Sequence, residues 1–334
     1  MRPFIAHFLT PNAFPLVIEP RLKTLTFRDF LSLLQEYQPL FSEKLQAYGA
    51  LLFRGFPLQQ AAEFEASIRS LDLGNFVDYI GGDSPRTKVT NHVYTSTEAP
   101  PWFRIPLHNE LSFMPNYPRH IYFFCSLPAE EGGATPIADA RRIYATINPS
   151  IRDRWQERKI RYLSSYFSRH LLLEMLNRVQ PSHRSWHQVF ETDSKNRVEN
   201  LCRQAEFEYE WKRGNWLKLA QTRPATIEHE SSQEPVWFNQ AHLFDFNPRL
   251  LGRWRYTAAK LFYRNRDHRL HEVSFGDGEE IPRSEMYQVM DALEEQAVEI
   301  PWQRGDFMVL DNVLAMHGRA PFKGRRRVLT AMTR

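Results

Sequence analysis

The first quarter of the chain shows two patterns of apolar and polar residues, one typical of a helix and one typical of a buried strand. Residues 27–47 place apolar side chains at mixed three- and four-residue steps, which predicts an amphipathic helix interrupted near Pro39. The short apolar run 50–56, closed by glycine and proline, predicts a buried strand. A second helix is expected over about 59–72.

From residue 88 onward the pattern is dominated by short apolar or alternating segments separated by proline and glycine. Strands are predicted at 88–95, 106–113, 119–126, 135–139, 207–212, 216–220, 225–229, 235–239, 307–310 and 328–333. Helices are predicted at 139–158 (divided near Pro149), 170–178, 194–205, 253–264 and 283–296. This spacing favours a mainly β fold with inserted α-helices, a barrel or a two-sheet jelly roll, over a wound parallel sheet.

The sequence contains no internal repeat, low-complexity tract or flexible linker, so we expect one domain over residues 1–334. Residues 166–235 are polar and rich in Arg, His and Glu. We interpret them as an insertion packed over one end of the barrel.

Composition excludes several classes of protein. The net charge of +4 is too mild to indicate a nucleic-acid or membrane partner, and an anionic small molecule suits it better. Two cysteines, Cys125 and Cys202, cannot build a disulfide framework, so a reducing compartment is expected. Prolines interrupt the first thirty residues, which indicates neither a signal peptide nor a membrane span. We therefore expect a cytoplasmic protein; a homo-oligomer is possible.

Two distant segments carry candidate metal ligands. In the first, His108 and Glu110 are two residues apart in a predicted strand, so both side chains would point to the same face. A His-x-Glu alone is more often a strand with two polar residues. The second segment, an apolar strand followed by Asp311-Asn312 and then His317-Gly318, supplies a third candidate.

Two histidines and one carboxylate on one face of a metal are typical of non-haem iron(II) oxygenases, which leave positions open for a keto acid and dioxygen. The same three ligands could hold zinc in a hydrolase. A jelly-roll binding module without turnover is the non-enzymatic alternative.

Candidate residues for the keto acid lie near these ligands. Arg326 is nine residues beyond His317, within Arg325-Arg326-Arg327, and guanidinium binds carboxylate in a bidentate manner. Alternation along a strand indicates that one of the three arginines faces inward, and Arg327 remains an alternative. The hydroxyl of Thr135 could donate to the same carboxylate.

Seven short motifs, in this order, resemble the taurine dioxygenase-like (TauD/TfdA) superfamily: Thr90-Asn91, Tyr94-Thr95-Ser96-Thr97, Leu107-His108-Asn109-Glu110, Gly132 to Asp139, Trp237-Phe238-Asn239-Gln240, Leu310-Asp311-Asn312 and His317-Gly318-Arg319. Within it, the chain looks most like the branch that contains the syringomycin-biosynthesis aspartate hydroxylase.

The resemblance implies a double-stranded β-helix (jelly roll, cupin-like) and an Fe(II)- and 2-oxoglutarate-dependent dioxygenase that uses O2. His108, Glu110 and His317 would be the iron ligands, and Thr135 and Arg326 would hold the distal carboxylate of 2-oxoglutarate. Halogenating relatives lack the carboxylate ligand, so Glu110 favours hydroxylation, although desaturation, cyclisation and other rearrangements use the same ligands.

The resemblance also bears on the substrate. Thr330 stands where relatives often carry a second functional arginine, which argues against a sulfonate substrate. The branch suggests an amino acid, free or tethered to a carrier protein, in secondary metabolism.

The candidate substrate-contacting residues lie beside or between the metal motifs; they are Asn91, Tyr94, Asn239, Gln240 and Arg319. Each could equally make a structural hydrogen bond. Asn109 is excluded because it would alternate outward. The remaining histidines, including His92, His120, His229 and His242, are interpreted as surface or supporting residues.

Overall fold

A computed structural model describes residues 2–22, 24–78, 86–168, 185–262 and 269–334. The strands are β1 (Phe4–Phe8), β2 (Leu16–Pro20), β3 (Ala50–Phe53), β4 (Tyr94–Thr95), β5 (Ile105–His108), β6 (His120–Leu127), β7 (Glu131–Gly132), β8 (Thr135–Asp139), β9 (Ile160–Tyr166), β10 (Glu208–Lys212), β11 (Trp216–Arg223), β12 (Thr226–Glu228), β13 (Pro235–Trp237), β14 (His271–Phe275), β15 (Val298–Ile300), β16 (Phe307–Asp311), β17 (Ala315–Arg319), β18 (Phe322–Lys323) and β19 (Arg327–Thr333). The helices are α1 (Phe27–Glu36), α2 (Gln38–Tyr48), α3 (Ala61–Leu71), α4 (Ala140–Thr146), α5 (Pro149–Arg158), α7 (Trp186–Val189), α8 (Lys195–Gln204), α9 (Ala241–Phe244), α10 (Pro248–Leu251), α11 (Arg253–Phe262) and α12 (Arg283–Glu295).

Two facing sheets form the central barrel. The larger has the strand order β1-β2-β3-β16-β6-β19-β4, and the smaller has the order β15-β8-β17-β5. Apart from the parallel pair β2 and β3, the paired strands of both sheets run antiparallel. This is the double-stranded β-helix expected from the resemblance.

Alternation along the strands of the larger sheet divides the core into two layers. On β6, Tyr122 and Phe124 pack outward beneath α1, α2 and α3, whereas Ile121, Phe123 and Cys125 point between the two sheets. The same period of two governs β16 and β19. The barrel interior is therefore apolar except where the functional residues enter it.

The smaller sheet is covered on its outer face by α4, α5 and α12. Ala138 of β8 and Met316 of β17 share one buried cluster with Trp155 of α5 and Met286 of α12. Burial of this apolar face fixes β8 and β17, and with them the side chains that point inward.

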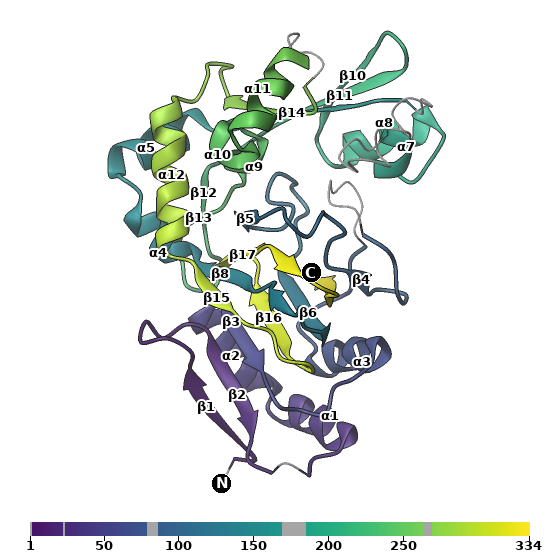
Figure 1. The fold of residues 1–334 in the computed structure, drawn as a ribbon, viewed down its shortest axis with the longest axis vertical. Helices are drawn as coiled ribbons and strands as arrows, with labels where there is room; N and C mark the ends of the chain where they lie inside the picture. Colours follow the sequence, from purple (N-terminus) through teal and green to yellow (C-terminus); the bar gives the residue numbers. More distant parts are fainter. Residues whose placement is uncertain (1, 23, 79–85, 169–184, 263–268) are drawn as a thin grey trace.

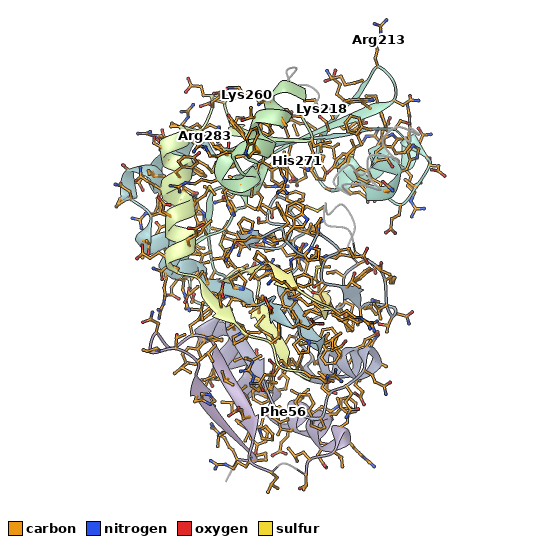
Figure 2. All side chains as sticks on the ribbon, in the orientation of Figure 1. Phe56, Arg213, Lys218, Lys260, His271 and Arg283 are labelled. Carbon is orange, nitrogen blue, oxygen red and sulfur yellow. The ribbon has the colours of Figure 1, made fainter. Side chains whose placement is uncertain are left out.

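A third sheet, with the strand order β10-β11-β9-β14, lies at one end of the molecule (Figure 1). Figure 1 shows α1 at the opposite end, and Figure 2 shows Arg213 projecting from the tip of the β10–β11 hairpin. Within residues 166–235, β10 and β11 pair with each other, and β11 pairs with β9, which precedes them in the chain. The interpretation of 166–235 as an insertion, and of the chain as one domain, stays a prediction.

Several expected elements are confirmed, and others differ. The interrupted helix becomes α1 and α2, and the strands at 119–126 and 135–139 become β6 and β8. The strand predicted at 106–113 is wrong beyond His108, because the chain turns there and Leu111 adopts a φ of 54°. Of 88–95 only β4 is a strand, and the helix predicted at 170–178 lies wholly outside the described residues.

In the part of the chain that the structure describes, no helix is long and apolar enough to cross a membrane.

Candidate active site

The three predicted metal ligands converge at one end of the barrel. His317 lies on β17 directly opposite His108 on β5, with ring centroids 4.5 Å apart, and Nε2 of His317 is 3.5 Å from Oε2 of Glu110. One ligand atom from each residue lies within 4.8 Å of the others. Of the groups of three or more His, Cys, Asp and Glu residues in the described parts of the chain, this is the one close enough to hold a metal.

A glycine allows the two histidines to meet. Gly318 lies where the pairing between β17 and β5 shifts register, and a Cβ there would be 2.5 Å from the carbonyl oxygen of Ile105. The absence of a side chain lets β5 approach β17 closely. His242 supports β5 from behind, since its Nε2 lies 2.7 Å from the carbonyl oxygen of Leu107.

Asn312, in the turn between β16 and β17, fixes the chain around Glu110. Its Oδ1 accepts from the Glu110 amide (2.8 Å), and its Nδ2 donates to the Glu110 carbonyl (3.0 Å). Nδ2 of Asn109 in turn donates to the carbonyl of Asn312 (2.7 Å). These buried bonds hold Glu110 in position although it lies beyond the end of β5.

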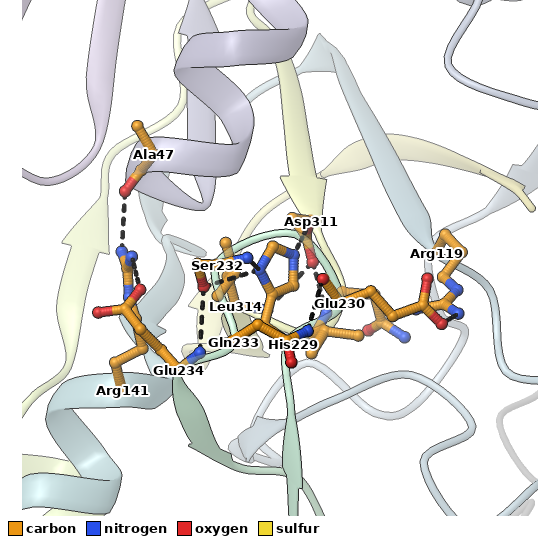
Figure 3. A network of polar contacts seen from close by, with 12 residues as sticks. Ala47, Arg119, Arg141, His229, Glu230, Ser232, Gln233, Glu234, Asp311 and Leu314 are labelled. Carbon is orange, nitrogen blue, oxygen red and sulfur yellow. Dashed lines mark hydrogen bonds and ion pairs between the residues drawn. The ribbon is translucent and has the colours of Figure 1, made fainter.

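A second polar network holds the turn between β16 and β17 (Figure 3). One carboxylate oxygen of Asp311 accepts from the amides of Val313 and Leu314, and the other lies 3.1 Å from Nε2 of His229. Burial opposes ionisation of Asp311, but the contact with His229 outweighs it and lowers the pKa of the carboxyl group. His229, expected to have a supporting role, thus ties the 226–237 hairpin to the turn.

The electrostatics of the ligands favour cation binding. Burial, helped by the neighbouring His317, lowers the pKa of His108 to about 3, so its imidazole is neutral at pH 7. Burial alone would raise the pKa of Glu110, but Arg86 and His317 hold it below its usual range. An ionised carboxylate beside neutral imidazole is the donor set that suits iron(II).

Arg326 and Thr135 lie side by side near these ligands. Nη2 of Arg326 is 3.5 Å from Oγ1 of Thr135, and its Nε donates to the Gly133 carbonyl (2.9 Å). Trp302 donates to the same threonine hydroxyl at 2.9 Å. Burial lowers the pKa of Arg326 to about 10, so the guanidinium is charged at pH 7 and available to a carboxylate.

The side chains of Arg325 and Arg327 are exposed, whereas Arg326 is half-buried and lines the cavity. The expected alternation therefore brings Arg326 rather than Arg327 to the site.

A cavity of about 280 Å³ joins all of these groups. Its described lining residues are Arg86, Ser96, Thr97, Ala99, Phe103, Ile105, His108, Glu110, Leu111, Phe113, Phe123, Thr135, Gln240, Leu243, Phe244, His271, His317, Gly318, Arg319 and Arg326. In Figure 2, His271 lies on the side of β14 that faces the barrel. The cavity thus has a metal end in the barrel and an aromatic wall from α9 and β14.

The sequence matches the family described as taurine catabolism dioxygenase TauD, TfdA over residues 9–333. The chain belongs to the TauD/TfdA family. It is therefore an Fe(II)- and 2-oxoglutarate-dependent dioxygenase, as the resemblance implied.

Individual comparisons agree with this assignment. The chain is 33% identical over 290 residues to the dapdiamide synthesis protein DdaC of Enterobacter agglomerans, covering 87% of this chain and 83% of that protein. It is 30% identical over 329 residues to a clavaminate synthase-like protein of Arabidopsis thaliana, covering 96% and 93%. A taurine dioxygenase structure from Burkholderia xenovorans shares the fold, with a TM-score of 0.55, 10% identity and coverage of 99% and 89%.

The predicted substrate residues of this TauD/TfdA dioxygenase fall into two groups. Gln240 and Arg319 line the cavity. Arg319 is buried and donates to the carbonyls of Ala99, Pro100 and Phe103, which holds that loop against the site.

The other three candidates are not among the described residues that line the cavity. The Asn91 side chain is exposed, and the Tyr94 hydroxyl donates to Asp78 at 2.7 Å. Asn239 is buried, donates to the Ala225 carbonyl and accepts from the Ala241 amide. The hydrogen bonds of Tyr94 and Asn239 are structural, which is the alternative stated above for each candidate. Asn91, Tyr94 and Asn239 are therefore left out of the proposed site.

Sequence reasoning missed Arg86 and the aromatic wall of Phe113, Phe244 and His271. Arg86 donates to Oε2 of Glu110 at 2.6 Å from a segment with no recognisable motif. The other three belong to ordinary apolar or polar patterns in three separate places: the turn after β5, α9 and β14. Only the fold brings them to this TauD/TfdA site.

Proposed function

We propose that this dioxygenase hydroxylates an unactivated C–H bond of an amino acid or an amino-acid-derived substrate, free or tethered to a carrier protein, in secondary metabolism. The observation that carries the proposal is the cavity, in which the three candidate metal ligands and the half-buried Arg326 occupy one end and an aromatic wall with polar groups occupies the other. The relative named for dapdiamide synthesis supports a role in making a specialised metabolite.

In this proposal His108, Glu110 and His317 hold iron(II), and Thr135 and Arg326 hold the distal carboxylate of 2-oxoglutarate. Bound iron supplies the chemistry that couples O2 and 2-oxoglutarate to hydroxylation, with succinate and CO2 as the other products. The remaining task of the chain is to place one C–H bond of the substrate near the metal and to exclude water.

Two groups of side chains that line the cavity suit that task. Phe113, Leu243 and Phe244 offer apolar surface for the carbon skeleton, while Gln240 and His271 offer hydrogen bonds. Desaturation or cyclisation of a similar intermediate would use the same residues, so hydroxylation is distinguished by its product: a gain of one oxygen atom.

The test measures succinate released by the purified chain with Fe(II), ascorbate, 2-oxoglutarate and a panel of amino acids. We expect slow release alone, faster release with one amino acid or its carrier-bound form, and a product 16 mass units heavier. Glu110→Ala should abolish the release, whereas Glu279→Ala, which removes an exposed carboxylate paired with Arg158, should leave it unchanged. Unchanged release by Glu110→Ala would refute the ligand assignment.

A further inference from the structure

Gln240 carries a buried polar side chain that lines the active-site cavity. The residue is only 5% exposed. Its backbone amide donates to the Tyr162 hydroxyl (3.3 Å), but no described residue hydrogen-bonds its carboxamide. The adjacent Asn239 differs, since its carboxamide donates to the Ala225 carbonyl and accepts from the Ala241 amide. Of these two neighbouring carboxamides, one supports the chain and the other borders the cavity.

A buried carboxamide without a protein partner favours a ligand that supplies one. Such a group has given up hydrogen bonds that it would make in water, and leaving them unmade is costly. A ligand that enters the cavity displaces any water at Gln240 and must replace the hydrogen bonds of that water. A ligand with matching polar atoms is therefore preferred over one that presents carbon at this position.

The chain around Gln240 is held in a fixed place relative to the proposed metal ligands. Gln240 directly precedes α9, and Nε2 of His242 in that helix lies 2.7 Å from the carbonyl oxygen of Leu107. Leu107 is followed on β5 by the proposed ligand His108. A substrate bound by Gln240 would therefore present the rest of its skeleton to the metal in one reproducible position.

A second polar group, the imidazole of His271, lines the same cavity. Its ring packs edge-on against Phe244, with ring centroids 4.9 Å apart, and its Nδ1 lies 3.3 Å from the Ser164 hydroxyl. In the described parts of the chain no residue is bonded to its Nε2, so this nitrogen is left for a ligand. Because Phe244 is the last residue of α9, His271 and Gln240 both belong to the α9 side of the cavity.

The chemistry of a carboxamide limits what Gln240 binds best. Its oxygen accepts hydrogen bonds and its nitrogen donates them, so a complete partner needs a donor and an acceptor side by side. A carboxylate offers acceptors only, and an ammonium group offers donors only. A primary carboxamide offers both, and two carboxamides pair through two antiparallel hydrogen bonds.

We propose that Gln240 recognises a primary carboxamide of the substrate through such a pair of hydrogen bonds, with His271 bound to the same group. The inference rests on the proposed function and names the polar group that its substrate carries. The pairing holds the amide beside α9 and leaves the carbon skeleton to pack on Leu243 and Phe244.

The first experiment compares amides with acids of the same shape. Succinate release by the purified chain with Fe(II) and 2-oxoglutarate is measured with asparagine against aspartate and with glutamine against glutamate. Each compound is supplied free and as its N-acetylcysteamine thioester, which imitates attachment to a carrier protein. One amide should exceed the matching acid about ten-fold or more in kcat/KM, because a carboxylate leaves the Gln240 oxygen unpaired.

The possible failures are distinct. An acid used as well as its amide, or stimulation confined to amino acids without an amide, would overturn the inference and leave the proposed function standing. If no amino acid of the panel stimulates release, the proposed function fails, and the inference fails with it.

The second experiment tests Gln240 itself. Gln240→Leu removes both hydrogen-bonding atoms, and the nearly isosteric Gln240→Glu replaces the donor with a second acceptor. Both variants should raise KM for the preferred amide about ten-fold or more, and Gln240→Leu should bring the amide-to-acid ratio of kcat/KM close to one. An unchanged ratio in Gln240→Leu would overturn the assignment.

Matched variants complete the second experiment. Gln59→Leu removes an exposed carboxamide before α3 and should keep the KM and the ratio of the wild type. Mn(II) binding, measured by calorimetry, shows that each Gln240 variant still forms the metal site. His271→Phe keeps a ring against Phe244 but removes both nitrogens, and it should raise KM for the amide about three-fold or more. An unchanged KM would exclude His271 from the recognition of the amide.

Discussion

At the scale of single residues, each group of the site depends on a neighbour that controls its charge or position. His108 is neutral because it is buried, and Glu110 is ionised because Arg86 and His317 outweigh the effect of burial. Arg326 remains charged at pH 7 although burial lowers its pKa to about 10. A neutral His108, an anionic Glu110 and a cationic Arg326 are the protonation states that the proposed chemistry requires.

Arg326→Ala tests the clamp. The variant should raise the apparent KM for 2-oxoglutarate about 10- to 100-fold, because hydrogen bonds to a charged group contribute roughly 1.5–3 kcal/mol. The measurement is succinate release against 2-oxoglutarate concentration. Arg327→Ala removes the exposed adjacent guanidinium and should leave KM unchanged; the reverse pattern would assign the clamp to Arg327.

Residues with a distinctive local motif could be predicted from the sequence, and residues without one could not. His108, Glu110 and His317 stand in short recognisable motifs, and the structure brings all three together. Arg86 lies 24 positions from Glu110 in an ordinary polar segment, so its contact with that carboxylate exists only through the fold. Asn239 shows the converse: it stands within a recognisable motif, but its side chain makes two structural hydrogen bonds.

At the scale of elements, β5 and β17 are the part of the fold on which the site depends most. Their pairing places His108 opposite His317, and the bulge at Gly318 permits the close approach. The turn that follows β5 is then held by Asn312 from the turn that precedes β17. The ligands therefore share one small structural unit although they are far apart in sequence.

Gly318→Ala tests this unit. The Cβ of the alanine would lie 2.5 Å from the Ile105 carbonyl oxygen, and this clash should lower the free energy of unfolding by roughly 1–3 kcal/mol. Because the clash also pushes β5 away from β17, it should separate His108 from His317 and weaken Mn(II) binding at least ten-fold. Denaturant unfolding and calorimetry measure the two effects.

Gly278→Ala is the matched control. Its φ of 90° disfavours a side chain at a cost on the order of 1 kcal/mol, but the Cβ would meet nothing within 4 Å. It should lose stability and keep its Mn(II) affinity. Equal Mn(II) affinities for the two variants would show that the close approach at Gly318 is unnecessary.

The elements predicted correctly are those whose pattern is strong over many residues, such as α12 and β19. The hairpin of β1 and β2 was missed because its prolines were interpreted as breakers, whereas Pro20 ends β2 and the other prolines lie outside the strands. The strand predicted to reach residue 113 stops at His108, since the turn is fixed by Asn312, about 200 positions away. Local patterns do not contain such long-range contacts.

At the scale of the whole molecule, metal binding and folding are coupled. His108 and His317 come from opposite halves of the sequence and meet only in the closed barrel. A ligand that binds the folded chain alone stabilises it by mass action.

Mn(II) in place of iron should therefore raise the thermal midpoint of unfolding. At a concentration 100-fold above Kd the stabilisation is about 2.7 kcal/mol, or roughly 5 °C for a chain of this size. Differential scanning calorimetry measures the shift. His317→Ala should abolish it, and His7→Ala, a half-exposed histidine on β1, should not. A full shift in His317→Ala would place the metal elsewhere.

The two ends of the cavity come from different parts of the molecule: the proposed iron ligands come from the barrel, whereas Phe244 comes from α9 and His271 from β14 of the third sheet. Mutations at the second end can accumulate without disturbing oxygen activation. Descendants of one ancestral enzyme could thus acquire new substrates while their oxidative machinery stays the same, and an engineer could follow the same route by randomising only α9 and β14.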